Sequence, residues 1–545
     1  MKRAIRLACF ASLGALSIAS CVSKTGKEDS GGETPVDPNK TQVYVGNYYG
    51  GLGDAWLRTL AEEYMAEHDD VQIHIDNDKA RYLPDQLLNA IGTYRQNLFF
   101  VDNCYYYDLA TQGHLADITD VVTTPLTEYG ETRSIADKLP EALTSFFANN
   151  SITNGRYYAL PSYQSHNGWV YDVDLFESKD FYFASDSTAG NYKFTGKGAK
   201  SVGPDGVTGT YDDGLPVTFD DFYALMDRMV SMNVTPFIWT GSYIDYTTRA
   251  LRSIWANYEG ADNYSLNNTF SGSELLYGDS TPTVIEEKNA YELQRQTGKL
   301  KALQFARKVC DNSFNYTQSS TGTSSSHLAA QKEFLNSTPM NRPIAMICEG
   351  DWWENEARGS GAFDTTVSRF GSQYAYGTRR FAFMSDPTDS EGKQGEHTMV
   401  STSSNGAFFV NAKNSEKTMK AAKGFLRYCH TDHALALFTT YTGVVRPYDY
   451  QLSAEEESKL TPFSRSTYAL YRDSRSRMVY DLSACATRNN NTQYFRDYWM
   501  FTSIAGSQTY EHPFKAFLNN KSLTAEAYFQ GMKEYHKANW SRFGF

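Results

Sequence analysis

The chain has 545 residues, which is long for a single domain and predicts two or more domains or lobes. Hydrophobic residues make up 41% and charged residues 21%, a composition that excludes both a disordered polar chain and a bundle of membrane helices. The net charge of −12, with no basic stripe, argues against nucleic acid as a partner. Aromatic residues reach 14%, and 39 of them are tyrosines. Such residues suit a surface that stacks on a ligand and offers it a polar edge.

The N-terminus has the pattern of an export signal. Residues 1–20 combine basic side chains, an apolar run from Leu7 to Ile18, and small residues before Cys21. The run is too short to span a bilayer. The stretch up to Cys21 resembles a bacterial lipobox, in which the cysteine is lipidated; an ordinary signal peptide with a chance cysteine is the alternative. Residues 21–41 are polar and predict a flexible tether, so we expect a body held at the extracellular or periplasmic side of the membrane by the lipid alone.

The cysteines beyond the leader are scattered and show no CxxC spacing. Neither a disulfide framework nor a zinc site is therefore expected, and most should be small buried apolar residues. They are Cys104, Cys310, Cys348, Cys429 and Cys485.

Short strands alternate with amphipathic helices from Thr41 onward. Apolar runs predict strands at 42–46, 71–75, 98–101, 157–160, 169–171, 235–239, 343–348 and 406–410. Apolar residues at helical spacing predict helices at 54–68, 83–95, 218–232, 292–312 and 416–428. This alternation predicts an α/β fold with largely parallel sheets.

Several stretches, taken together, resemble the carbohydrate-type extracellular solute-binding proteins (family 1) of ABC importers. They occur in the family's order along nearly the whole chain, and they are Gly113–Thr119, Leu160–Pro161, Gly168–Phe176, Ala345–Trp353 and the block from Phe514 to Trp540. The resemblance implies a two-lobe periplasmic-binding-protein-like fold (type II), with the lobes joined by hinge crossings around a ligand cleft. It also implies a monomeric receptor, not an enzyme, that captures a carbohydrate, here expected to be an oligosaccharide, and delivers it to ABC permease subunits.

The resemblance also implies how the chain is divided between the lobes. Residues 41–158 and 403–444 would form one lobe, and residues 159–402 and 445–545 the other. The crossings would lie near Leu160, at 397–405 and at 442–446.

A neutral sugar presents apolar faces and hydroxyl rims, so its binding site needs flat aromatic rings beside polar side chains. Such sites lie between lobes and at the carboxyl ends of parallel strands. The candidates follow expected strands or crossings: Tyr48, Tyr49, Asp102, Asn103, Tyr163, His166, Trp239, Tyr243, Glu349, Asp351, Trp352, Trp353, Arg446 and Trp499.

These candidates have structural alternatives. Asp102 could cap a helix, His166 could be a satisfied structural histidine, and Trp499 could belong to a helix core. The turn Glu349–Trp353 carries the strongest signal, because an acid and paired tryptophans follow a strand. One tryptophan should face the cleft and the other should pack in its lobe, and their spacing does not say which.

Residues 203–214 form a candidate loop for binding a metal ion. It places Asp205, Asp212 and Asp213 among glycines. Carboxylates and backbone carbonyls can wrap Ca²⁺, although an Asp- and Gly-rich surface loop is the alternative. A Ca²⁺ ion in this loop would be structural, and we expect the protein to require no cofactor.

Sequence motifs of common enzymes are missing. No HExxH, GxSxG or Walker A pattern occurs. A secreted glycoside hydrolase, or another carbohydrate-active enzyme, is the enzymatic alternative, since it would share the aromatic and acidic composition and its carboxylate pair has no fixed spacing in sequence. The lipobox and the order of the motifs favour the receptor.

Overall fold

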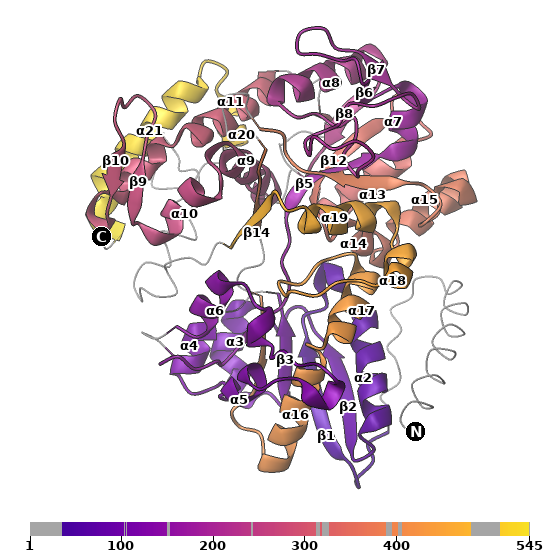
Figure 1. The fold of residues 1–545 in the computed structure, drawn as a ribbon, viewed down its shortest axis with the longest axis vertical. Coiled ribbons are helices and arrows are strands. Elements are labelled where there is room, and N and C mark those ends of the chain that lie inside the picture. The colour runs from indigo at the N-terminus through magenta and orange to yellow at the C-terminus, as the bar shows by residue number, and fades with distance from the viewer. Residues whose placement is uncertain are drawn as a thin grey trace.

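The computed structural model describes residues 35–102, 104, 106–149, 153–240, 244–311, 317–318, 326–388, 395–401, 406–480, 513–543 and 545. The chain forms two α/β lobes, one above the other in Figure 1, and each has its own five-stranded sheet. No helix within these ranges is long and apolar enough to cross a membrane.

The first lobe, at the bottom of Figure 1, is built on a sheet of order β2-β1-β3-β15-β4. Strands β1, β2 and β3 run parallel, and β15 runs antiparallel to β3 and β4. Its elements are β1 (Thr41–Asn47), η1 (Gly50–Leu52), α2 (Ala55–Glu67), β2 (Val71–Asn77), α3 (Pro84–Ala90), η2 (Ile91–Thr93), β3 (Leu98–Val101), α4 (Tyr106–Thr111), α5 (Thr119–Thr123), η3 (Thr127–Tyr129), η4 (Ala136–Lys138), α6 (Glu141–Phe147), β4 (Leu160–Pro161), β15 (Ala407–Val410), α16 (Glu416–Tyr428) and α17 (Asp432–Thr442).

The second lobe is built on a sheet of order β11-β8-β12-β5-β13. Strands β11, β8 and β12 are parallel, whereas β5 is antiparallel to both β12 and β13. Up to the hinge its elements are β5 (Asn167–Asp172), α7 (Val173–Lys179), β6 (Tyr182–Phe183), β7 (Phe194–Thr195), α8 (Phe219–Ser231), β8 (Thr235–Ile238), α9 (Ile244–Glu259), α10 (Ala261–Thr269), β9 (Gly272–Glu274), β10 (Thr283–Ile285), η5 (Glu287–Arg295), α11 (Thr297–Asp311), β11 (Thr317–Gln318), α13 (His327–Ser337), β12 (Ile344–Gly350), α14 (Trp353–Gly359), α15 (Ala362–Phe370), η6 (Ser372–Tyr374) and β13 (Phe381–Met384).

The remaining elements include a separate two-stranded sheet and the C-terminal helices. Strands β14 (His397–Ser401) and β16 (Ser476–Tyr480) pair in parallel as a separate two-stranded sheet. The other elements are α18 (Ala454–Lys459), α19 (Pro462–Arg472), α20 (Pro513–Asn519), α21 (Ala525–Asn539) and η9 (Trp540–Phe543).

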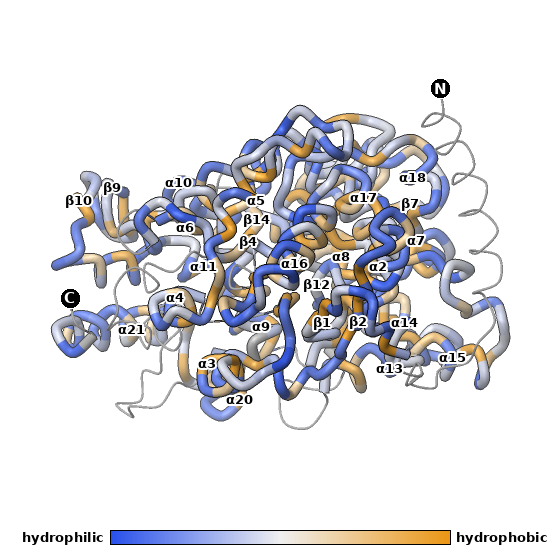
Figure 2. The backbone as a smooth tube through the Cα atoms, turned by 90° about the horizontal axis from the view of Figure 1, so that it is seen from below, coloured by the Kyte–Doolittle hydropathy of each residue, from blue (hydrophilic) through white to orange (hydrophobic). Residues whose placement is uncertain are grey.

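Burial of both sheet faces explains the continuous apolar runs in the sequence. All seven residues of β12 are buried, as expected of a central strand with helices on both sides. Its Met346 and Cys348 pack in a cluster with Trp169 and Phe237, and its Ile347 packs in another cluster with Phe381. Figure 2 shows hydrophobic residues gathered around β1, β2 and β12.

The first lobe's core continues past the expected boundary at residue 444. Val445, Tyr448 and Tyr450 all pack in the same cluster as β1 and β3. The chain passes from β4 in one sheet to β5 in the other within a few residues. The lobes are therefore tied by short, buried segments, which suits a hinge.

One expected helix is interrupted. The pattern over 292–312 predicts a single helix, but the structure has η5 followed by α11, with Gln296 between them. The Gln296 backbone is extended, at ψ 133°, and its amide donates to Glu274 (2.8 Å) and accepts from Trp255 (2.9 Å). These side-chain hydrogen bonds hold Gln296 in the break between the two helices.

Candidate functional site

Three polar residues of the first lobe meet where its strands end. Asp102 follows β3 and Tyr163 follows β4, and the Tyr163 hydroxyl donates a hydrogen bond to Asp102 Oδ1. Burial raises the pKa of Asp102, against the pull of Arg249 and Lys79. Tyr48 follows β1, and burial, reinforced by the Asp102 charge, raises its pKa to about 12. The ends of three strands thus converge, as expected at the carboxyl edge of an α/β sheet.

The second lobe contributes an aromatic and charged group to the same place. Tyr246 and Arg249 lie on α9, and Trp352 follows β12. The Tyr246 ring meets the Trp352 ring edge-on at 6.0 Å between centroids and stacks on His327 at 5.7 Å. Arg249 Cζ lies 5.6 and 5.7 Å from the Tyr246 and Trp352 ring centroids. Tyr246 and Trp352 pack in or against the same hydrophobic cluster as Tyr48 and Tyr163, so the side chains from the two lobes form one group.

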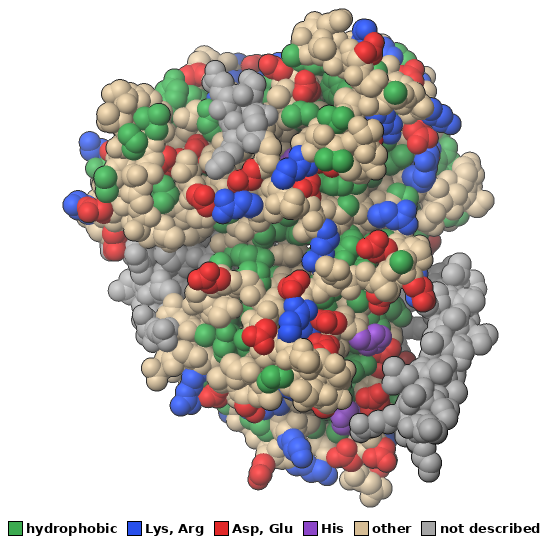
Figure 3. All heavy atoms as spheres, in the orientation of Figure 1, with side chains coloured by type: hydrophobic (Ala, Val, Ile, Leu, Met, Phe, Trp, Pro, Cys, Tyr) green, Lys and Arg blue, Asp and Glu red, His purple; other side chains and the backbone are tan. Residues whose placement is uncertain are grey.

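Helix α14 brings the lobes into contact. Trp352 directly precedes the first turn of α14, and its side chain packs in the core cluster of the first lobe. The two lobes are close here, because a Cβ on Gly51 would lie 3.2 Å from Trp352 Cδ1. Asn355 Nδ2 donates to the Gly51 carbonyl (2.7 Å), and Arg358 Nη2 donates to the Tyr441 carbonyl (3.1 Å). Figure 3 shows hydrophobic side chains gathered at the waist between the lobes.

A pair of carboxyl groups lies behind these aromatic rings. The Gln331 amide nitrogen donates to Glu349 Oε1 (3.1 Å) and to Glu356 Oε2 (2.8 Å). Glu349 is 1% exposed, and burial, reinforced by the Glu356 charge, raises its pKa well above the ordinary value. Within the described part of the chain, Glu349 Oε2 has no hydrogen-bond partner.

The arrangement can bind a polyhydroxylated ligand. Tyr48, Tyr163, Tyr246 and Trp352 provide flat faces, and the carboxyl and guanidinium groups between them provide hydrogen-bond partners. Small-molecule sites typically combine a lining of hydrophobic and aromatic side chains with a small number of precisely placed polar groups.

Sequence reasoning missed three members of this site: Tyr246, Arg249 and Glu356. A signal was present, because Tyr246 and Arg249 are three residues apart at the start of the helix that follows β8, and therefore share a helix face. Glu356 lies one helical turn after the paired tryptophans.

The structure separates the two adjacent tryptophans. Trp353 is fully buried in the second lobe, where its ring meets those of Phe334, Phe381 and Phe463 at 5.8, 5.1 and 5.4 Å. Trp352 is 8% exposed and faces the first lobe. Trp353 is therefore the packing residue and Trp352 the one at the lobe interface.

Two sequence-predicted contacts are packed in cores instead. Trp239 is fully buried in the second lobe against Phe514, with 4.3 Å between ring centroids. Arg446 is fully buried in the first lobe, and its guanidinium donates to the carbonyls of Ser162 and Cys429, both at 2.8 Å. Both side chains therefore have packing roles: Trp239 contacts a core ring, and Arg446 is hydrogen-bonded to backbone carbonyls.

His166 and Asp351 are also buried, deeper than the aromatic group. Burial lowers the pKa of His166 to about 3 and raises that of Asp351 to about 8. Asp351 Oδ2 accepts from the Tyr471 hydroxyl at 2.6 Å, and the Asp351 amide donates to the His166 carbonyl at 3.2 Å. Tyr49 is 45% exposed in a left-handed turn (φ 72°). Asn103, Tyr243, Trp499 and the lipidation residue Cys21 lie outside the described residues.

The Asp-rich loop uses its carboxylates for its own turns. Asp212 accepts from the Asp205 amide (2.8 Å) and the Thr210 hydroxyl (2.9 Å), and Asp213 accepts from the Gly209 amide (2.8 Å). Over the ranges that the structure describes, no group of three His, Cys, Asp or Glu side chains is placed to hold a metal ion. Calcium binding stays a prediction, which chelation and a melting curve would test.

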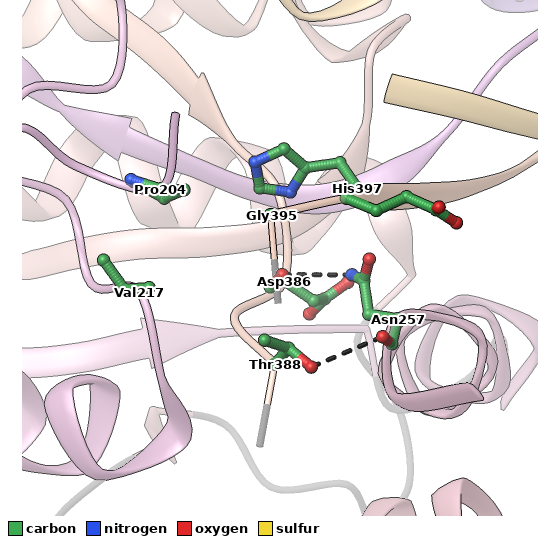
Figure 4. Close-up of a pocket in the computed structure, with 8 residues that line it drawn as sticks. Pro204, Val217, Asn257, Asp386, Thr388, Gly395 and His397 are labelled. Atoms are coloured by element: carbon green, nitrogen blue, oxygen red, sulfur yellow. Dashed lines mark hydrogen bonds between the residues drawn. The ribbon is translucent and has the colours of Figure 1, made fainter. Parts of the chain in front are cut away.

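A separate hollow lies inside the second lobe, beside β14 (Figure 4). Asn257 Nδ2 donates to the Asp386 carbonyl (3.1 Å), and Thr388 Oγ1 donates to the Asn257 carbonyl (3.3 Å). The cavity volume of about 20 Å³ suits a water molecule and is too small for a sugar ring.

Comparison with solved structures identifies the fold. No protein-family model matches the chain, and no curated protein matches it in sequence. The SBP RafE from Streptococcus pneumoniae in its apo form is 13% identical, with a TM-score of 0.55 over 93% of this chain and 99% of that one. A chitin oligosaccharide binding protein is 14% identical, with a TM-score of 0.54 over 92% and 100%. A probable secreted solute-binding lipoprotein from Streptomyces coelicolor is 11% identical, also with a TM-score of 0.54 over 92% and 100%.

These matches span nearly the whole of both chains. The protein has the two-lobe α/β fold of solute-binding proteins, which confirms the fold that the motifs predicted. At this identity the likeness establishes the fold alone.

Proposed function

We propose that this protein is a solute-binding receptor that captures a carbohydrate, expected to be an oligosaccharide, and delivers it to an ABC importer. The observation that carries the proposal is the convergence of Tyr48 and Tyr163 from one lobe with Tyr246 and Trp352 from the other. A sugar that binds between two hinged lobes needs aromatic and polar groups from both lobes, and this interface has them.

Proteins of the same fold support the choice of ligand. The RafE structure was solved in complex with raffinose, and another of these proteins is named for binding chitin oligosaccharide. Both ligands are chains of sugar rings with apolar faces, which suits a site with several aromatic side chains.

The proposal includes no chemical step. Lobe closure around the sugar would create the surface that the permease subunits recognise, and the ATPase would be a separate chain. A glycoside hydrolase would instead need two carboxyl groups flanking a bond of the bound sugar.

A thermal-shift screen of the protein without residues 1–34 tests the proposal. A sugar that binds only the folded state raises the melting temperature. The probes are raffinose, chitotriose and maltotriose, with titration calorimetry on any that shift. Failure of every neutral oligosaccharide in a broader panel to shift melting would count against the receptor. Cleavage products after incubation with the same probes would favour the hydrolase.

The lipid anchor is tested separately. Cys21→Ser removes the thiol that the lipobox would modify, so we expect the full-length variant to leave the membrane fraction. Fractionation followed by immunoblotting measures this. Retention of the variant in the membrane to the same extent as the parent would show that Cys21 is not the anchor.

A further inference from the structure

A buried carboxyl group lies where α14 meets the first lobe. Glu354 is in the first turn of α14 and is 5% exposed. Its Oε2 accepts hydrogen bonds from the Thr461 hydroxyl (2.5 Å) and from the Ser464 hydroxyl (3.3 Å). Thr461 is the N-cap of α19 and accepts from the Ser464 amide (3.1 Å), which fixes both residues at the start of that helix. The Glu354 side chain therefore joins α14 to α19.

Residues of the first lobe complete the enclosure of Glu354. The C-terminal end of α17, Thr440–Gly443, lines the same small cavity as Glu354 and Ser464. It lies directly against α19, because a Cβ on Gly443 would be 2.5 Å from Ser464 Oγ. The cavity volume is about 10 Å³, which is room for about one water molecule. Both lobes thus shield Glu354 from solvent, and separation of the lobes would expose it to water.

The groups around Glu354 compensate only part of the cost of its ionisation. Burial raises the pKa of Glu354 to about 7, against the opposing effects of the two hydroxyl groups and of Arg358, one turn later on α14. The other titratable groups that line the cavity come from α17, α18 and the loop before β13, and are Tyr441, Lys459 and Tyr376. Lys459 Nζ is already paired with Glu455 (2.9 Å). Burial raises the pKa of Tyr376 to about 12, so this phenol stays neutral at physiological pH.

We propose that Glu354 is a pH-sensitive latch between the lobes, whose protonated form holds the closed arrangement and whose ionised form favours opening. The inference goes beyond the proposed function, because it concerns how the lobes open and requires no particular ligand. A protonated carboxyl group can stay in the enclosed site, since its carbonyl oxygen still accepts hydrogen bonds from the hydroxyl groups. A carboxylate gains hydration when the lobes separate, and its ionisation therefore shifts the equilibrium toward the open form.

The direction of the pH effect follows from the difference in pKa between the two arrangements. In the open arrangement Glu354 would meet water and titrate like an ordinary glutamic acid, at about pH 4. In the closed arrangement its pKa is about 7. Between about pH 4 and pH 7 the closed form holds a proton that the open form has lost. The stabilisation of the closed form is therefore present below that window and is lost as the pH rises through it.

Small-angle scattering of the ligand-free protein, without residues 1–34, tests the latch at pH 5 and at pH 8. We expect the parent to have a larger radius of gyration at pH 8. Glu354→Gln keeps an acceptor for Thr461 and cannot ionise, so this variant should keep at pH 8 the radius that it has at pH 5. A parent with the same radius at both values, or a variant that expands as much as the parent, would overturn the inference.

Sugar affinity provides a second measurement, and this one rests on the proposed function. With the best probe among raffinose, chitotriose and maltotriose, the parent should bind about fivefold or more weakly at pH 8 than at pH 5, because a less populated closed form lowers the apparent affinity. Glu354→Gln should lose most of this pH dependence, and a variant with the full parental dependence would count against the latch. If no probe binds the parent, the proposed function fails, while the scattering measurement still decides whether Glu354 is a latch.

Glu274→Gln is the matched control. Glu274 is also buried, at 3% exposed, and burial, reinforced by the Glu259 charge, raises its pKa to about 9. It lies on β9 of the second lobe, where it accepts from Gln296 (2.8 Å). This variant should keep the parental change of radius and of affinity with pH. Loss of the pH response to the same extent as in Glu354→Gln would show that Glu354 is not the latch.

Ser464→Ala tests the same group without removing it, and serves if Glu354→Gln does not fold. The Ser464 hydroxyl lowers the Glu354 pKa, so its removal should raise that pKa. We therefore expect the pH midpoint of opening, followed by scattering, to move above that of the parent. A purely structural role for Glu354 predicts no such shift, and a midpoint at or below the parental one would overturn the inference.

Discussion

Trp352 and Trp353 are neighbours in sequence and differ in environment. Trp353→Ala should lower the free energy of unfolding by about 3–5 kcal/mol, because it empties a fully buried site among phenylalanines. Trp352→Ala should weaken sugar binding by about ten- to a hundredfold, equivalent to roughly 1–3 kcal/mol of lost stacking and area burial. Denaturant melts and titration calorimetry on both variants measure the two effects. Equal sugar affinities for the parent and a folded Trp352→Ala variant would remove Trp352 from the site.

Asp351 makes stability depend on pH. Its pKa of about 8 in the folded state lies above that of an unfolded aspartate, so the folded state holds a proton that the unfolded state has lost between about pH 4 and pH 8. Stability from this group is therefore present below that window and is lost as the pH rises through it. Asp351→Asn keeps an acceptor for Tyr471 and cannot ionise. We expect the variant to gain on the parent in melting temperature from pH 5 to pH 9; parallel pH profiles would contradict this.

At the scale of elements, α14 links the lobes. Asn355 and Arg358 donate to backbone carbonyls of the first lobe at Gly51 and Tyr441, and such bonds contribute about 0.5–1.5 kcal/mol each. Replacing both with Ala should disfavour the closed arrangement and weaken sugar binding by about five- to a hundredfold, although neither side chain need touch the ligand.

The control for this variant is Arg369→Ala, an exposed arginine on α15. Titration calorimetry should show parental affinity for the control and weaker binding for the α14 double variant. A double variant that binds as tightly as the parent would mean that the α14 contacts do not set the closing equilibrium.

For the whole molecule, two lobes joined by short buried segments predict a hinge motion. Ligand favours the closed state only to the extent that it binds that state better than the open one. Small-angle scattering should show a smaller radius of gyration at saturating sugar, and the α14 double variant should show a larger one without sugar. A radius that is the same with and without bound sugar would contradict hinge closure and leave sugar binding itself intact.

Local patterns were sufficient for many elements and for part of the site. The strands around 42–46 and 98–101 and the helix over 54–68 occur close to their expected bounds, because each has an apolar pattern of the right period. Asp102, Tyr163 and Trp352 were found because they follow such strands. The helix expected at 292–312 was interrupted because Gln296 bonds to partners distant in sequence, and no local pattern contains them.

The sequence by itself determined the fold class, the order of the elements and the kind of residues that a ligand would meet, since these depend on periodicity and composition. Tertiary structure alone decided that Trp352 and not Trp353 faces the first lobe, and that Arg446 is enclosed by carbonyls. It also packed Tyr246 of the second lobe against the core cluster of the first lobe, with Arg249 beside its ring. The residues that follow a strand can point into their own lobe or toward the other lobe, and the choice depends on what packs against them. Those packing contacts join residues that lie hundreds of positions apart in the sequence.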